Sequence, residues 1–141
     1  MEIKAFMDGI WLYHSSNNNI VGNNITTNTR YGINLEDSSL NNTIVGNSIT
    51  TNTGYGIILT YNSNNSIVGN NITNNGGGIG LFRSSNNTLR SNVMAGNEPN
   101  FHVYGYGLSH FMNDVDVSNI VDGKPMYYWI NKSDEIVPVD A

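Results

Sequence analysis

The sequence predicts an all-β protein: a right-handed parallel β-helix (solenoid) of about four coils, followed by a non-repeat, hairpin-like C-terminal segment. A phrase that opens with glycine recurs at Gly9, Gly32, Gly56 and Gly78, so each coil is 22–24 residues long. Apolar residues alternate within each copy with the period of two that is typical of strands. No window shows the 3.6-residue period of a helix.

Each copy predicts three short strands. The first strand contributes two buried aliphatic residues and the other two contribute one each, and these residues form columns along the stacked copies. Because polar, glycine-rich corners separate the strands, each strand is expected to pair in parallel with its equivalent one coil later, about 4.8 Å away. The first strand carries Ile10, Ile33, Ile57 and Ile79, with Leu12, Leu35, Leu59 and Leu81 two residues on; the second carries Ile20, Ile44, Ile67 and Leu89; the third carries Ile25, Ile49, Ile72 and Met94.

Asparagines follow the same period and form three columns. Stacked amides can hydrogen-bond along a column as ladders, and asparagine tolerates the left-handed backbone of tight corners. We therefore interpret these columns as structural: Asn18, Asn42, Asn65 and Asn87; Asn23, Asn47, Asn70 and Asn92; Asn28, Asn52, Asn75 and Asn97.

The repeat divides the chain into residues 1–104, which form the coils, and residues 105–141, which form the non-repeat segment. Before the first full coil, the alternation of Ile3, Ala5 and Met7 predicts a strand that pairs onto it. After Tyr104, the sequence predicts a hairpin or an altered coil, with a turn at Asp122-Gly123 and an aromatic strand over residues 126–130. We expect this segment to continue into a longer chain.

Composition excludes several classes of function. The net charge is −5 and only 12% of residues are charged, which argues against nucleic acid as a partner. The absence of cysteine excludes disulfides and thiolate metal sites. No apolar run is long enough for a membrane span, and no signal peptide is visible. We expect an extracellular, cell-surface or periplasmic location as part of a longer chain.

The repeated phrase G-I-x-L-x-x-S-S-N-N-x-I-x-G-N-x-I-x-x-N over residues 9–99 resembles the NosD-type, or CASH-type, parallel β-helix repeat of the pectate-lyase-like superfamily. The segment from Asp114 to Trp129 resembles a part of archaeal surface proteins with such repeats. The resemblance implies the fold. It also implies three kinds of activity: copper delivery to nitrous oxide reductase, a cell-surface role, or, in a few distant relatives, cleavage or isomerisation of polysaccharides.

A non-enzymatic structural or adhesive role, with polysaccharide or surface proteins as partners, is the leading hypothesis. Aromatic and charged residues recur at outward positions of the first strand, between and after the buried Ile and Leu, and sugar faces stack on aromatic rings. The candidate carbohydrate-binding residues are Trp11, Tyr13, His14, Glu36, Asp37, Tyr61, Phe82 and Arg83. The competing interpretation is ordinary cross-strand packing.

Two alternatives remain open. A copper-handling accessory factor would use His110 and Met112 as ligands from one strand face, because imidazole and thioether suit copper; in the leading hypothesis no cofactor is needed. A carbohydrate-active enzyme needs paired carboxylates, whereas Glu36 and Asp37 are adjacent and point apart on a strand, so we assign no catalytic residue. Open solenoid ends expose sheet edges, which predicts self-association.

Overall fold

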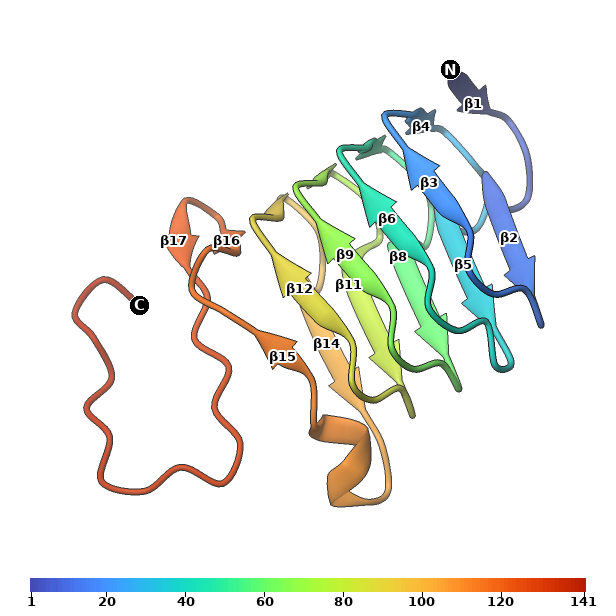
Figure 1. The fold of residues 1–141 in the computed structure, drawn as a ribbon. Coiled ribbons are helices and arrows are strands. Elements are labelled where there is room, and N and C mark those ends of the chain that lie inside the picture. The colour runs from blue at the N-terminus through green and yellow to red at the C-terminus, as the bar shows by residue number, and fades with distance from the viewer.

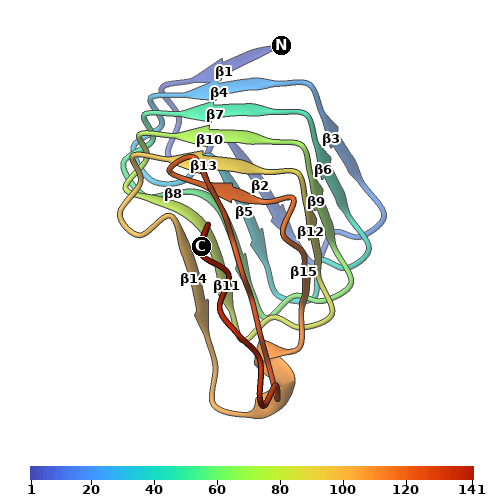
Figure 2. The same ribbon diagram turned by 90° about the vertical axis from the view of Figure 1, so that its left-hand side faces the viewer.

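The computed structural model describes residues 1–141 and shows a right-handed parallel β-helix whose coils stack along one axis (Figure 1). Three sheets form the sides of the solenoid, and the turned view in Figure 2 shows the strands of each sheet one above the other. All pairings are parallel except the last, between β16 and β17. The predicted fold class is therefore confirmed.

Sheet 1 holds the first strand of every coil, in the order β14-β11-β8-β5-β2. Its strands are β2 (Ile10–Tyr13), β5 (Ile33–Glu36), β8 (Tyr55–Thr60), β11 (Gly77–Phe82) and β14 (Phe101–Tyr104). Sheet 2 holds the second strands, β3 (Asn19–Val21), β6 (Thr43–Val45), β9 (Ser66–Val68), β12 (Thr88–Arg90) and β15 (Asp114–Val115).

Sheet 3 holds the third strands and extends furthest at both ends. Its strands are β1 (Glu2–Lys4), β4 (Asn24–Thr26), β7 (Ser48–Thr50), β10 (Asn71–Thr73), β13 (Val93–Ala95), β16 (Ile120–Val121) and β17 (Lys124–Pro125). The only helical element is a 3-10 turn, η1 (Leu108–Phe111). No helix of the chain has the length and apolarity needed to cross a membrane.

The predicted aliphatic columns form the core. Strand register places Ile33 beside Ile57 and Leu35 beside Leu59, and all four side chains are fully buried. Because burying one such side chain contributes roughly 1.5–3 kcal/mol, stacked columns are the main source of stability in a fold with no other core. Fifteen buried residues form one continuous cluster along the axis.

The three asparagine ladders are present and have a direction. Each Oδ1 accepts both the backbone N–H and the Nδ2–H of the asparagine one coil earlier: Asn70 Oδ1 accepts from Asn47 N and Nδ2, both at 3.0 Å. A fourth ladder, which we did not predict, stacks Ser39, Asn62 and Ser84 at the corner after the first strand. Buried polar groups are thus paired throughout the corners.

The left-handed backbone of the corners does not lie at the ladder asparagines, as the sequence had suggested. It lies at the residue immediately before each of them, for example Asn41 (φ 55°) before Asn42 and Gly46 (φ 63°) before Asn47. The preceding residue turns the chain, which leaves the ladder asparagine free to direct its amide along the stack.

The chain after Tyr104 continues the sheets and forms a fifth coil. β15 pairs with β12 and β16 pairs with β13, although η1 is inserted between β14 and β15. The turn at Asp122-Gly123 is confirmed, because it joins the antiparallel strands β16 and β17. The boundary at residue 104 between two domains stays a prediction, as does association at the solenoid ends.

One local prediction was wrong, and a second was confirmed only in part. Residues 126–130 form no strand, because β17 ends at Pro125 and the chain then runs irregularly past the end of the core. The strand predicted before the first full coil is present as β1, which pairs with β4 of that coil, but it is shorter than predicted. Only Ile3 is buried; Ala5 has a positive φ of 62°, which ends the alternation, and Met7 is exposed.

Candidate functional site

The outer face of sheet 1 differs from the other two sheets because its strands carry aromatic side chains. No strand of sheet 2 or sheet 3 contains an aromatic residue. Register places the outward residues of sheet 1 in columns, as the repeat predicts: Trp11, Asn34, Ile58, Gly80 and His102 in one, and Tyr13, Glu36, Thr60, Phe82 and Tyr104 in the next. This face is the candidate functional site.

The corner after the first strand presents a third column, His14, Asp37, Tyr61 and Arg83. All four residues have a left-handed backbone, with φ between 45° and 57°. This conformation is uncommon for bulky residues and ends each strand at the same point. Their side chains therefore leave the solenoid along one edge of sheet 1, and Asp37 makes no side-chain hydrogen bond there.

The N-terminal aromatic cluster consists of Trp11, Tyr13 and His14. The Trp11 and Tyr13 ring centroids lie 5.9 Å apart, and Tyr13 meets His14 edge-on at 4.3 Å. The Trp11 indole Nε1 donates to Glu36 Oε2 at 2.9 Å, which fixes the ring while 56% of Trp11 remains exposed. A large ring held in place but open to solvent is a suitable platform for a ligand.

An ion pair that the sequence analysis did not find lies beside this cluster. The Asp8 carboxylate, whose side chain is only 5% exposed, accepts from Arg30 Nε at 2.8 Å and from Asn34 Nδ2 at 3.1 Å. Burial raises the pKa of Asp8, but the hydrogen bonds from Arg30, Asn34 and the Tyr31 amide lower this pKa by a larger amount, so the net shift is downward. This pair joins the segment before β2 to the end of the first coil, and the bond from Asn34 reaches the second coil.

The C-terminal aromatic cluster consists of Tyr55, Phe82, His102 and Tyr104. Phe82 meets Tyr55 at 5.7 Å and His102 at 5.2 Å, both edge-on, and the Tyr55 hydroxyl lies 3.0 Å from His102 Nδ1. Gly80 makes this packing possible, since a Cβ there would lie 2.7 Å from the Phe82 ring and 3.0 Å from the Tyr55 ring. Burial raises the pKa of Tyr55.

Arg83 lies at the edge of the C-terminal aromatic cluster, between two tyrosines. Its guanidinium carbon is 5.0 Å from the centroid of the Tyr61 ring and 4.3 Å from that of Tyr106, and its Nη2 donates to the Tyr106 hydroxyl at 2.6 Å. Hydrogen bonds from Tyr104 and Arg83 lower the pKa of Tyr106. Cation and rings therefore hold one another in place.

The predicted aromatic stripe is thus two clusters, because Asn34, Ile58 and Thr60 separate them on the face. Sequence reasoning missed Tyr55, His102, Tyr104 and Tyr106. The repeat register, with Phe101 and Val103 at the Ile and Leu positions of a fifth strand, places His102 and Tyr104 in the two columns, whereas Tyr106 lies in the loop after β14 and follows no repeat.

The proposed copper ligands do not lie on one strand face. His110 belongs to η1 and Met112 follows at its end, so the strand that would align them is absent. His110 Nδ1 already accepts the Tyr106 N–H at 3.2 Å, and nowhere in the chain do three His, Cys, Asp or Glu side chains lie together as a metal site would need. These residues do not fit a copper centre.

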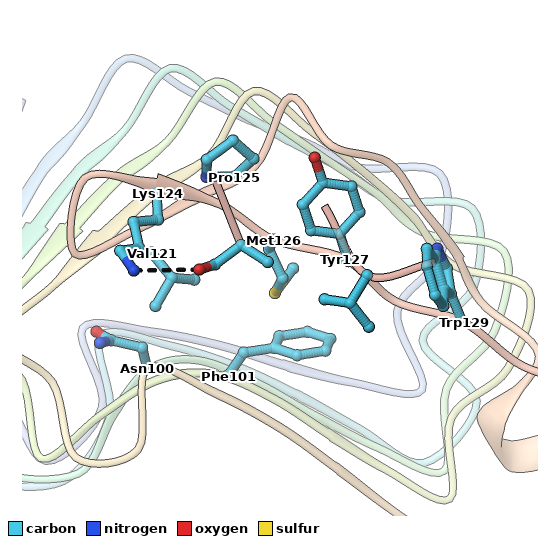
Figure 3. A pocket seen from close by; sticks show the side chains of 10 residues that line it. Asn100, Phe101, Val121, Lys124, Pro125, Met126, Tyr127 and Trp129 are labelled. Atoms are coloured by element: carbon cyan, nitrogen blue, oxygen red, sulfur yellow. Dashed lines mark hydrogen bonds between the residues drawn. The ribbon is translucent and has the colours of Figure 1, made fainter. Parts of the chain in front are cut away.

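A cavity of about 780 Å³ lies at the C-terminal end of the solenoid (Figure 3). Its floor is Phe101 and Val121, which continue the aliphatic core columns of sheets 1 and 3, and its walls include Met126, Tyr127 and Trp129. Since it occupies the place of the next core layer, we interpret it as the incompletely covered end of the core and not as a ligand site.

Stacked three-strand coils, internal amide ladders and an aromatic outer sheet define a right-handed parallel β-helix protein. A family model described as periplasmic copper-binding protein (NosD) matches residues 2–127. The chain therefore belongs to the NosD family. No curated protein matches it.

Two solved structures share the fold. The T265N mutant of the periplasmic alginate epimerase AlgG is 25% identical, with a TM-score of 0.68, over 74% of this chain. A second AlgG structure is 19% identical, also with a TM-score of 0.68, over 85% of this chain. The matched regions span only 26% and 37% of those chains.

Proposed function

We propose that this chain is an exported, non-enzymatic β-helix segment that binds polysaccharide along the outer face of sheet 1, in a structural or adhesive role. The confinement of aromatic strand residues to sheet 1 carries the proposal. If these rings served only to pack a β-helix, they would have no reason to avoid the other two sheets, which have the same core and ladders. The periplasmic description of the family supports export.

The shape of the face favours an extended ligand. Its two clusters lie on coils that are stacked along one axis, with the half-buried Thr60 between them, so a chain molecule could contact both. Trp11, Tyr13, Tyr61 and Tyr104 are each 42–56% exposed although their neighbours hold them. The likeness to a protein that acts on alginate agrees with a polysaccharide ligand, but it concerns the fold of about a quarter of that chain.

The non-enzymatic part of the proposal is supported by the carboxylates. Glu36 is engaged by the Trp11 indole, and Asp37 is its neighbour in sequence at the corner, so they do not face each other across a ligand. General acid–base chemistry on a glycosidic bond needs two carboxyl groups on either side of it.

The test is a titration of the ¹⁵N-labelled chain with a panel of oligosaccharides. The chemical shifts of the backbone amides of Trp11, Tyr61 and Phe82, and of the Trp11 indole, are expected to change on addition of the sugar. The Trp11→Ala and Phe82→Ala variants should each bind roughly fivefold more weakly, since one stacked ring is worth about 1 kcal/mol. Val21→Ala, an exposed residue on sheet 2, is the matched control and should bind normally. Absence of shifts on sheet 1 with every sugar rejects the proposal.

Copper handling is the second candidate, and the family description favours it. His110 and Met112 remain the residues to test, although their geometry does not support a site. Calorimetric titration with Cu(I) decides between the two: equal affinity for the wild-type chain and for His110→Ala removes His110 as a ligand, and a large loss of affinity in the variant restores the copper hypothesis.

A further inference from the structure

Arg83 is the one arginine of this acidic chain that has no carboxylate partner. Arg30 pairs with Asp8, and Arg90 pairs with Asp114 and Asp116. No acidic side chain lies within 4.0 Å of Arg83, although the chain carries 11 acidic residues and a net charge of −5. Its positive charge is therefore available on the face that carries the aromatic clusters.

The position of Arg83 is fixed before any ligand arrives. Tyr61 and Tyr106 lie against the guanidinium, and the Tyr106 hydroxyl accepts one of its hydrogens. The left-handed backbone at Arg83 (φ 51°) directs the side chain away from the end of β11. Since a free arginine loses conformational entropy when it is immobilised, a guanidinium that is already held in place binds an anion at a lower cost.

The guanidinium keeps most of its hydrogen-bonding capacity. An arginine has five N–H donors in a planar fork, and the bond to Tyr106 is the only hydrogen bond that the Arg83 guanidinium makes within the chain, since the other hydrogen bond of this residue is donated by its backbone N–H to the Tyr104 carbonyl. A planar fork with free donors matches a carboxylate, which it can bind through two parallel hydrogen bonds. Aromatic rings lie next to the guanidinium. The ring centroids of Phe82 and Tyr104 are 6.2 Å apart, and those of Tyr104 and Tyr106 are 5.5 Å apart.

We propose that Arg83, held between Tyr61 and Tyr106, binds the carboxylate of a uronic acid residue while the neighbouring rings of Phe82 and Tyr104 stack on the sugar chain. The inference rests on the proposed polysaccharide binding and names its substrate class, an acidic polysaccharide built from uronates. Neutral sugars would contact the rings alone.

The experiment compares a uronic acid hexasaccharide with its carboxyl-reduced, neutral counterpart, by calorimetry on the full chain. The wild-type chain should bind the acidic form roughly tenfold more tightly, since a charged hydrogen-bonded pair is worth about 1.5 kcal/mol or more. This preference should weaken as salt concentration rises. The Arg83→Gln variant should lose the preference and bind both forms as the wild type binds the neutral one.

Lys124→Gln is the matched control, because it removes the same charge from an exposed residue in sheet 3 and should keep the tenfold preference. If Arg83→Gln keeps the preference, or if the wild type binds both hexasaccharides equally, the inference is overturned while polysaccharide binding stands. If neither form binds, the proposed function itself fails. Thermal melting of each variant confirms that the fold is intact before affinities are compared.

Discussion

The inside of the coils and the outer face of sheet 1 are made from the same strands, yet residue type varies little along the axis inside and strongly along the axis outside. Inside, most positions repeat one residue type, as Ile33, Ile57 and Ile79 do, and the exceptions, such as Leu89 and Met94, are also apolar. Outside, the neighbouring column changes from Trp11 to Asn34, Ile58, Gly80 and His102. A parallel coil can stack only if its inner side chains match those above and below, whereas outer side chains need not match one another and range from the exposed Trp11 to the buried Asn34 and Ile58. The varied face is therefore where binding residues can accumulate at little cost in stability.

The largest effect should come from emptying one position of the core. Leu59→Ala removes a fully buried side chain from the third coil and should lower the free energy of unfolding by about 3–4 kcal/mol, measured by urea denaturation. Tyr61→Ala, two residues away on the outer edge, should change it by less than about 1 kcal/mol, because Tyr61 is 48% exposed. Equal losses of unfolding free energy in the two variants would contradict the distinction between the core and the outer face of sheet 1.

A break in the middle of a ladder should have the next largest effect. Asn70→Ala removes the acceptor of two buried donors of Asn47 and should cost about 2–3 kcal/mol. Asn18→Ala, at the exposed end of another ladder, should cost less than about 1 kcal/mol, since Asn42 Oδ1 keeps the bond from the backbone of residue 18. Urea midpoints of the two variants measure the difference, and a similar cost at both positions would show that the ladders add little beyond the strands.

The ion pair at the border of the face should have the smallest of the three effects, and it depends on pH. Because the folded-state pKa of Asp8 lies below its ordinary value of 3.8, the ionised carboxylate stabilises the fold above pH 3.8, and this contribution is lost as pH falls through the lower folded pKa. Asp8→Asn should therefore be less stable than wild type by about 1–2 kcal/mol at pH 7. Well below pH 3.8 the two should converge, and a constant gap at all pH values would count against this origin.

The repeat was sufficient to predict most of the scaffold, because parallel stacking transmits register from coil to coil. It failed where the spacing changes. Asn113 and Asn119 extend two ladders at distances of 26 and 27 residues, since η1 lengthens the fifth coil, and Asn100 extends the third from only three residues beyond Asn97. No fixed period could have found these three residues.

The candidate site was predictable in part for the same reason. Trp11, Tyr13, Glu36 and Phe82 follow from the strand register, and so do the corner residues Tyr61 and Arg83. The contacts among them do not follow, because a side chain at one level can reach a neighbour one or two coils away. Tyr55 contacts His102, which lies 47 residues later in the sequence. Gly80 permits this contact because it has no side chain to occupy the space between the rings.

The sequence by itself determined the fold, the core columns and three of the ladders, since a period of 22–24 residues with fixed inner residues allows one way of stacking. Only the tertiary structure decided that the aromatic residues form two clusters, that His110 and Met112 do not align for copper, and that Arg83 alone among the arginines lacks a carboxylate. The physical reason is that inner positions are constrained by identical neighbours, whereas outer contacts depend on how far each side chain reaches and on loops, such as that of Tyr106, which obey no repeat.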